Sequence, residues 1–142
     1  MGQAKQAVDT FWDLMESGDL DRLPEIWTAE TEFHMAGQTM RGFDDVKRLR
    51  DQWWGAFPNL HHTTTDYVES GDVYACELVV TGRHDGTMAT PMAEILATGR
   101  DVEMRSADYI KVHDGKIVRW DAYPDMLGLL GQIGALPEPA SA

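Results

Sequence analysis

The segment 113–116, His-Asp-Gly-Lys, is the strongest constraint on what this chain can fold into. Asp-Gly between two stretches of alternating apolar and polar residues is typical of a two-residue type I′ hairpin turn. One strand is predicted before the turn, over 102–112, and a second after it, over 117–123. Because a tight turn fixes which residues face each other, the sequence predicts the pairing along the whole hairpin.

Counting outward from this turn places two acidic residues opposite each other. If His113 faces Lys116, then Asp108 faces Asp121, and Ser106 faces Tyr123. All four side chains then share one face of the sheet with Met104, because strand residues alternate with a period of two. Two opposed carboxylates about 5 Å apart repel by about 3 kcal/mol at an effective dielectric near 20. One would therefore keep its proton, which suits acid/base chemistry near neutral pH.

Two other interpretations of this face stay open. The face is solvated, or Arg119 lies diagonally beside the two carboxylates and neutralises them. The opposite face of the hairpin is too apolar to lie bare in water, which predicts a homodimer interface. Its expected members are Ala107, Tyr109, Val118, Trp120 and Ala122.

Length and composition favour one soluble domain. The chain has 142 residues, of which 43% are hydrophobic and 25% charged. We expect a single domain over 1–142, with a core over about 5–135 and a frayed tail over 136–142. Because no run of eighteen apolar residues and no signal-peptide pattern occurs, a cytoplasmic location is the default expectation.

Charge and cysteine content exclude several functions. The formal net charge of -12 argues against nucleic acid and against an anionic membrane surface as partners. Cys76 is the only cysteine, so an internal disulfide and a cysteine-rich metal site are excluded. The five histidines show no spacing typical of a zinc site, and we expect no metal.

The spacing of apolar residues divides the chain into a helical half and a sheet half. Helices are predicted over 3–17, 20–27, 43–57 and 126–133, and strands over 31–36, 60–68 and 73–81 in addition to the hairpin. A loop over 82–100 resembles a lid or binding segment. This order predicts an α+β fold in which a curved antiparallel sheet wraps around helices and forms a cone with an internal pocket.

The order of several sequence pieces resembles the SnoaL-like polyketide cyclase family of the nuclear-transport-factor-2-like cone superfamily. These pieces are "RGFDDVKRL", "AFPNLHHTTTDYVESGDVYACELVVTGRHDG", "ATGRDVEM" and "MRSADYIKVHDGKIVRWDAYPDMLGLLGQIGALP", and the likeness covers roughly residues 5 to 137. The resemblance implies an enzyme of secondary metabolism that closes a ring in a hydrophobic polyketide-derived substrate. The reaction would be an intramolecular aldol addition without metal or organic cofactor.

The resemblance also suggests roles for the two acidic residues. Asp121 matches the family's acidic residue on the last strand, which removes a proton from the carbon between two carbonyls and then protonates the new alkoxide. Asp108 stands where a polar partner, often histidine, is expected. The match is uneven, because many relatives carry Asp near position 122, where this chain has Ala122.

Other residues are candidates for contact with the substrate. His34 could donate a hydrogen bond to an enolate oxygen, or it is a structural histidine. Tyr123 could polarise a carbonyl group, and His84 stands at the start of the expected lid. The full set of expected substrate-binding residues is Tyr123, Ser106, Trp12, Trp27, Trp53, Met35, His84, Met104 and Arg119.

Two rival functions stay open. One is epoxide hydrolysis or isomerisation on the same fold, which in relatives needs an Arg two residues before the strand Asp. Ser106 stands there, although Arg119 could substitute for it in space. The other is a dimeric module that binds a small ligand without catalysis, for which both acidic residues would have ordinary pKa values.

Overall fold

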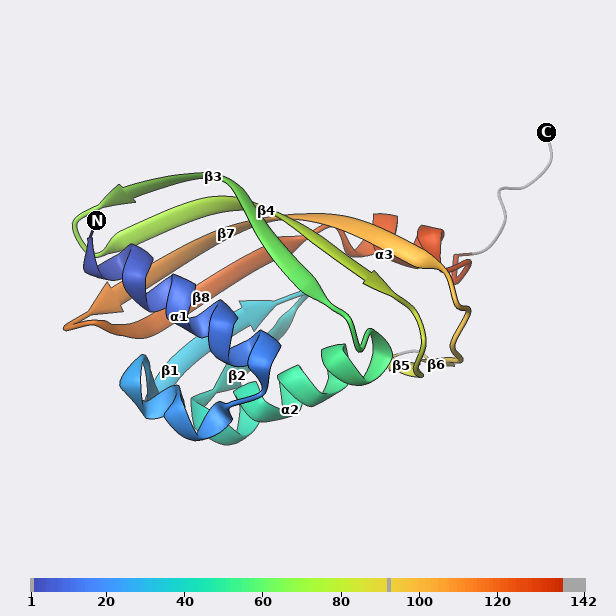
Figure 1. The fold of residues 1–142 in the computed structure, drawn as a ribbon, viewed down its shortest axis with the longest axis horizontal. Coiled ribbons are helices and arrows are strands. Elements are labelled where there is room, and N and C mark those ends of the chain that lie inside the picture. Colours follow the sequence, from blue (N-terminus) through green and yellow to red (C-terminus); the bar gives the residue numbers. More distant parts are fainter. Residues whose placement is uncertain (1, 92, 137–142) are drawn as a thin grey trace.

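The computed structural model describes residues 2–91 and 93–136 (Figure 1). The helices are α1 (Gln3–Ser17), the 3₁₀ helix η1 (Leu20–Glu25), α2 (Gly42–Ala56) and α3 (Met126–Gln132). The strands are β1 (Trp27–Met35), β2 (Gln38–Arg41), β3 (His61–Ser70), β4 (Val73–Arg83), β5 (Met88–Ala89), β6 (Glu94–Ile95), β7 (Asp101–His113) and β8 (Lys116–Pro124). Within these residues, no helix is both long and apolar enough to span a bilayer.

The main sheet has six strands in the order β2-β1-β8-β7-β4-β3. It curves around α1 and α2, which cover its inner side, while α3 packs against β7 (Figure 1). The α+β cone predicted from the sequence is therefore confirmed. One detail differs, because β1 and β8 run parallel whereas the other neighbouring strands are antiparallel.

The predicted boundaries agree best where the apolar period is regular. Helix 3–17 is confirmed, and α2 and α3 lie within one residue of their predicted ends. The predicted second helix is the shorter 3₁₀ turn η1, and the following strand begins at Trp27, earlier than predicted. The predicted loop over 82–100 contains the small β5–β6 hairpin. The predicted tail lies outside the described residues from position 137 onward.

Helix α1 is fastened to strand β3 at both ends. At the amino end, the Glu69 carboxylate accepts hydrogen bonds from the backbone N–H groups of Gly2 and Lys5, at 3.0 and 2.7 Å. At the carboxyl end, the Glu16 carboxylate accepts a bond of 2.9 Å from the backbone N–H of His62. Both carboxylates satisfy N–H groups that helix or strand geometry leaves without a backbone partner.

The β7–β8 hairpin contains a bulge that the turn alone does not predict. His113 faces Lys116 and Val112 faces Ile117, as predicted, but the next pair is Lys111 with Arg119. Val118 is thus the extra residue, and every later pair is shifted by one position. The hydroxyl of Thr31, which is fully buried, donates a 2.6 Å hydrogen bond to the carbonyl oxygen of Ile117 next to the bulge.

The bulge has a clear energetic reason. Without it, Trp120 and Ala122 would point out of the cone while Arg119, Asp121 and Tyr123 would point in. With it, Trp120 is 0% exposed and packs against Phe11 with 4.6 Å between ring centroids. Burying an aromatic side chain stabilises a fold by about 2–3 kcal/mol, whereas burying the cation of Arg119, which is half exposed on the outer face, would cost free energy. The sheet therefore slips by one residue.

The two faces of the sheet now differ from the prediction on β8 but not on β7. Buried and exposed residues alternate along the whole of β7, with Met104, Ser106, Asp108, Ile110 and Val112 inside, as predicted. On β8, Trp120 and Ala122 lie inside, so their expected place on the outer face is wrong. The outer face keeps Ala107, Tyr109 and Val118, and a homodimer through this face stays a prediction.

Candidate active site

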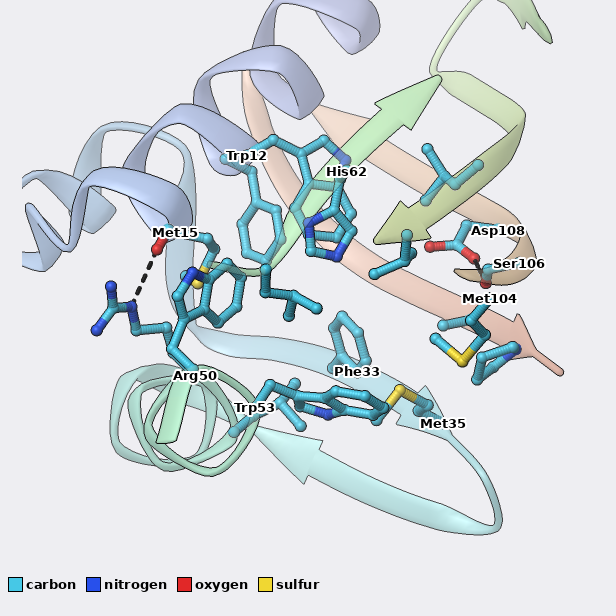
Figure 2. A pocket seen from close by; sticks show the side chains of 18 residues that line it. Trp12, Met15, Phe33, Met35, Arg50, Trp53, His62, Met104, Ser106 and Asp108 are labelled. Atoms are coloured by element: carbon cyan, nitrogen blue, oxygen red, sulfur yellow. Dashed lines mark hydrogen bonds between the residues drawn. The ribbon is translucent and has the colours of Figure 1, made fainter. Parts of the chain in front are cut away.

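A mainly apolar pocket lies between α1, α2 and the inner face of the sheet (Figure 2). Its enclosed volume is ≈ 70 Å³, within a wider hollow of ≈ 570 Å³ that includes open solvent. Ligand pockets typically measure about 300–1,000 Å³, so a large guest requires side chains to move. The lining residues are Phe11, Trp12, Met15, Phe33, Met35, Leu49, Arg50, Trp53, Trp54, Leu60, His62, Leu78, Val80, Met104, Ser106, Asp108, Ala122 and Pro124.

Asp108 is the one carboxyl group among the residues that line this pocket. It lies on β7 and is 5% exposed. Its Oδ1 accepts a 2.5 Å hydrogen bond from the hydroxyl of Ser106, and its Oδ2 accepts a 2.8 Å bond from Nε1 of Trp120. Two bonds from neighbouring inner-face residues fix the orientation of the carboxyl group in the pocket wall. Figure 2 shows Asp108 beside Ser106.

Burial raises the pKa of Asp108 above its ordinary value of 3.8. Loss of hydration disfavours the charged form and is the largest cause. The hydrogen bonds from Ser106, Trp120 and the backbone of Tyr123 act in the opposite direction, because they stabilise the carboxylate. A carboxyl group held between these influences is suited to take up and release a proton closer to neutral pH.

Asp121 does not face Asp108, so the predicted carboxylate pair is wrong. The bulge places Ala122 opposite Asp108 and Tyr109 opposite Asp121. Asp121 consequently lies on the outer face. Its Oδ2 is 2.9 Å from Nη2 of Arg119, and its Oδ1 is 3.9 Å from Nε2 of His34.

The prediction that Tyr123, Arg119 and His34 share the pocket with Asp108 is also wrong. Tyr123 is 67% exposed, and the same shift that moves Asp121 turns it outward together with Arg119. His34 pairs with Asp121 across β1 and β8 and forms a 3.0 Å hydrogen bond with Thr39. His34, Asp121 and Tyr123 line a second hollow beside the β1–β2 hairpin, which adjoins the pocket at Met35, Ala122 and Pro124.

Five of the predicted substrate-binding residues do line the pocket: Ser106, Met104, Met35, Trp12 and Trp53. Trp27 does not, because it is buried in the core and donates a 3.0 Å bond from Nε1 to the carbonyl oxygen of Gly42. His84 does not either. It is fully buried beside Phe57 and accepts a 3.3 Å bond at Nδ1 from the backbone N–H of Thr98.

His62 is a pocket residue that the sequence interpretation did not select. Its neighbour His61 is exposed, whereas the His62 ring lies against Trp12 in the pocket wall. The signal was present in the alternation, because Leu60 is buried and a period of two then turns His62 inward.

Metal ligands are not grouped in the part of the chain that the structure describes. No three His, Cys, Asp or Glu side chains converge there in a way that could hold an ion. The prediction of a cofactor-independent reaction stays a prediction.

A curved sheet with helices on its concave side and an apolar pocket holding one buried carboxyl group defines an α+β cone protein. The family model of SnoaL-like polyketide cyclases matches residues 3–133, and the chain belongs to this family. The resemblance seen in the sequence is thereby confirmed. No curated protein matches the chain in sequence.

Solved structures show the same fold. A candidate SnoaL-like polyketide cyclase from Jannaschia sp. CCS1 superposes with a TM-score of 0.81 at 21% identity, over 95% of this chain and 94% of that one. TsrD from Streptomyces laurentii gives 0.80 at 25% identity, over 94% and 96%. IdmH from Streptomyces antibioticus, a candidate polyketide cyclase, gives 0.77 at 25% identity, over 94% and 99%.

Proposed function

We propose that this chain is a cofactor-independent, polyketide cyclase-like enzyme in which Asp108 is the acid/base group. The observation that carries the proposal is the position of Asp108, buried in the wall of an apolar pocket with a raised pKa. Membership of the SnoaL-like family supports the reaction class. The apolar lining supports a hydrophobic, polyketide-derived substrate.

The reaction proceeds through proton transfer at one carboxyl group. The Asp108 carboxylate removes a proton from a carbon between two carbonyls, and the resulting enolate attacks a carbonyl carbon of the same molecule. A carbon–carbon bond forms and the carbonyl oxygen becomes an alkoxide. The protonated Asp108 returns its proton to that oxygen, so the carboxylate is regenerated without a co-reactant.

The rival functions have weaker support. Epoxide opening needed Arg119 near the pocket carboxyl group, but Arg119 lies on the outer face beside Asp121. A non-catalytic binding module needed ordinary pKa values, whereas burial raises the pKa of Asp108. The acid/base role that we expected of Asp121 passes to Asp108 in this proposal, because Asp108 is the carboxyl group in contact with the pocket.

The test compares Asp108→Asn with Asp121→Asn. The rates to be measured are ring closure of linear poly-β-ketones and deuterium exchange of the α-protons of 2-tetralone in D₂O, followed by NMR. Asp108→Asn should slow both reactions by at least about 100-fold, the usual contribution of a positioned acid/base, while Asp121→Asn stays within about threefold of wild type. Near-normal rates in Asp108→Asn, or the large loss in Asp121→Asn instead, contradict the proposal.

A further inference from the structure

The imidazole ring of His62 is clamped in the wall of the pocket. Its side chain is 9% exposed. The ring stacks on Trp12 from α1, with 3.7 Å between ring centroids and 19° between planes, and Trp54 from α2 lies 5.7 Å away at 30°. Two flat partners therefore fix the plane of the ring, and its nitrogen atoms point in fixed directions.

The two nitrogen atoms of His62 have different surroundings. Nδ1 is buried without a hydrogen bond, 3.7 Å from Oε1 of Glu16. A carboxylate on that side favours the tautomer with its proton on Nδ1, which leaves a lone pair on Nε2. In Figure 2 the ring projects into the space between helices and sheet. Among the described residues, Nε2 has no hydrogen-bond partner.

The ring is neutral at physiological pH. Burial, and to a lesser degree the charge of the neighbouring His61, lowers the pKa of His62 to about 3. A neutral ring nitrogen that opens on a mainly apolar pocket favours a guest that can donate a hydrogen bond to it over one that cannot.

His62 and Asp108 lie far apart in the pocket, with mainly apolar side chains of the sheet between them. The sheet register aligns His62 with Val80 and Met104, whereas Asp108 lies four residues beyond Met104 along β7. Four strand residues and two strand spacings separate the two Cα atoms by about 16 Å. Leu78, Val80 and Met104 line the surface in between. His62 and Asp108 are therefore far enough apart to contact different parts of one guest.

We propose that His62 is a substrate-binding residue whose Nε2 accepts a hydrogen bond from a hydroxyl group on the end of the substrate remote from Asp108. The substrate class is thus a flat aromatic compound with a phenolic or enolic hydroxyl at that end. That this end of the substrate does not react rests on the proposed function, in which the reaction takes place at Asp108. The hydrogen bond itself does not, and it is tested by binding alone.

The test uses 2-naphthol, which can donate a hydrogen bond, and 2-methoxynaphthalene, which cannot. Dissociation constants are measured by quenching of tryptophan fluorescence for wild type, His62→Phe and His61→Phe. His62→Phe should weaken binding of 2-naphthol by about 3- to 10-fold, the usual effect of one hydrogen bond, and leave 2-methoxynaphthalene within about twofold. His61→Phe makes the same change at the exposed neighbour and should alter neither constant.

Histidine ¹⁵N spectra of the wild-type protein provide a second measurement that needs no variant. They should show His62 neutral with its proton on Nδ1 at pH 7, and a changed Nε2 resonance when 2-naphthol is added. Equal weakening of both probes in His62→Phe, or a proton on Nε2, overturns the proposal. Because neither readout uses turnover, a failure here is distinct from full activity in Asp108→Asn.

Discussion

Asp108 and Asp121 are almost equally buried, at 5% and 6% exposure, yet they lie on opposite faces of the same hairpin and have different neighbours. On the outer face, the guanidinium of Arg119 meets the charge of Asp121 at 2.9 Å. On the inner face, the side chains that bond to Asp108 are neutral donors, the Ser106 hydroxyl and the Trp120 indole. Low exposure alone therefore does not mark a reactive carboxyl group, because the partner that compensates its charge decides its chemistry.

The largest effect on stability is expected from Trp120→Phe. The change replaces the buried indole by a smaller phenyl ring and removes the 2.8 Å bond to Asp108, so the free energy of unfolding should fall by about 2–4 kcal/mol. That bond lowers the pKa of Asp108, so its loss should raise this pKa. The pH profile of deuterium exchange into 2-tetralone should therefore also move to higher pH. Trp27→Phe is the control, since Trp27 is equally buried but donates to Gly42. A displaced profile in the control as well would remove the special role of Trp120.

The pH dependence of stability should separate the inner carboxyl group from an ordinary one. The folded-state pKa of Asp108 is raised, so the folded state binds the proton more tightly than the unfolded state. The unfolding free energy, relative to Asp108→Asn, should therefore fall as pH rises from about 4 through the folded-state pKa. The fall is about 1.4 kcal/mol for each pH unit that separates the folded-state pKa from the unfolded-state pKa. Urea titrations across this range provide the measurement, and a difference that grows with pH would show the opposite sign.

Thr31→Val tests the bulge that keeps the two acidic residues apart. The substitution keeps the shape of the side chain but removes the 2.6 Å bond to the carbonyl oxygen of Ile117, together with the 2.9 Å bonds that join the Thr31 hydroxyl to the backbone N–H and the hydroxyl of Thr28. An unpaired buried carbonyl should lower the free energy of unfolding by about 1–2 kcal/mol. Thr63→Val, at an exposed position of β3, should change it by less than about 0.5 kcal/mol in the same urea titration. Equal losses at both positions would mean that the bulge bond contributes nothing special.

Arg119→Met should have the smallest effect. The guanidinium is half exposed, so its pair with Asp121 is screened by solvent and contributes at most about 1 kcal/mol. The loss of unfolding free energy caused by Arg119→Met should be smaller at high salt, because salt screens exposed charges. A double-mutant cycle with Asp121→Asn isolates the pair. A coupling above about 3 kcal/mol would instead indicate a buried ion pair.

The fold was largely readable from the sequence because its signals are local. The apolar period of 3–17 and the strict alternation of 102–112 predicted α1 and the two faces of β7. The order of elements and the Asp-Gly turn then indicated the cone. Such patterns depend on neighbours a few residues apart, and the sequence displays them directly.

The candidate site could be predicted only in part, because a shift of one residue in the strand pairing changes which side chains face each other. The bulge at Val118 depends on the burial of Trp120 and on Thr31, which is 86 positions from its partner Ile117. Asp108 was found from its strand alternation, but Asp121 was misplaced. The spacing of three between Ile117 and Trp120, instead of an even number, was the available sign that β8 breaks its period.

The reciprocal attachment of α1 and β3 bears on how this protein can be re-engineered. Glu69 of β3 bonds to one end of the helix, and Glu16 at the other end of the helix bonds to β3, so helix and strand are joined at both ends. A compound that is too bulky for the pocket would then have to be accommodated by changes in α2, on the other side of the pocket. Replacing Leu49 or Trp53 on α2 by a smaller residue should therefore broaden the substrate range, whereas substitutions in α1 would weaken its attachment to β3.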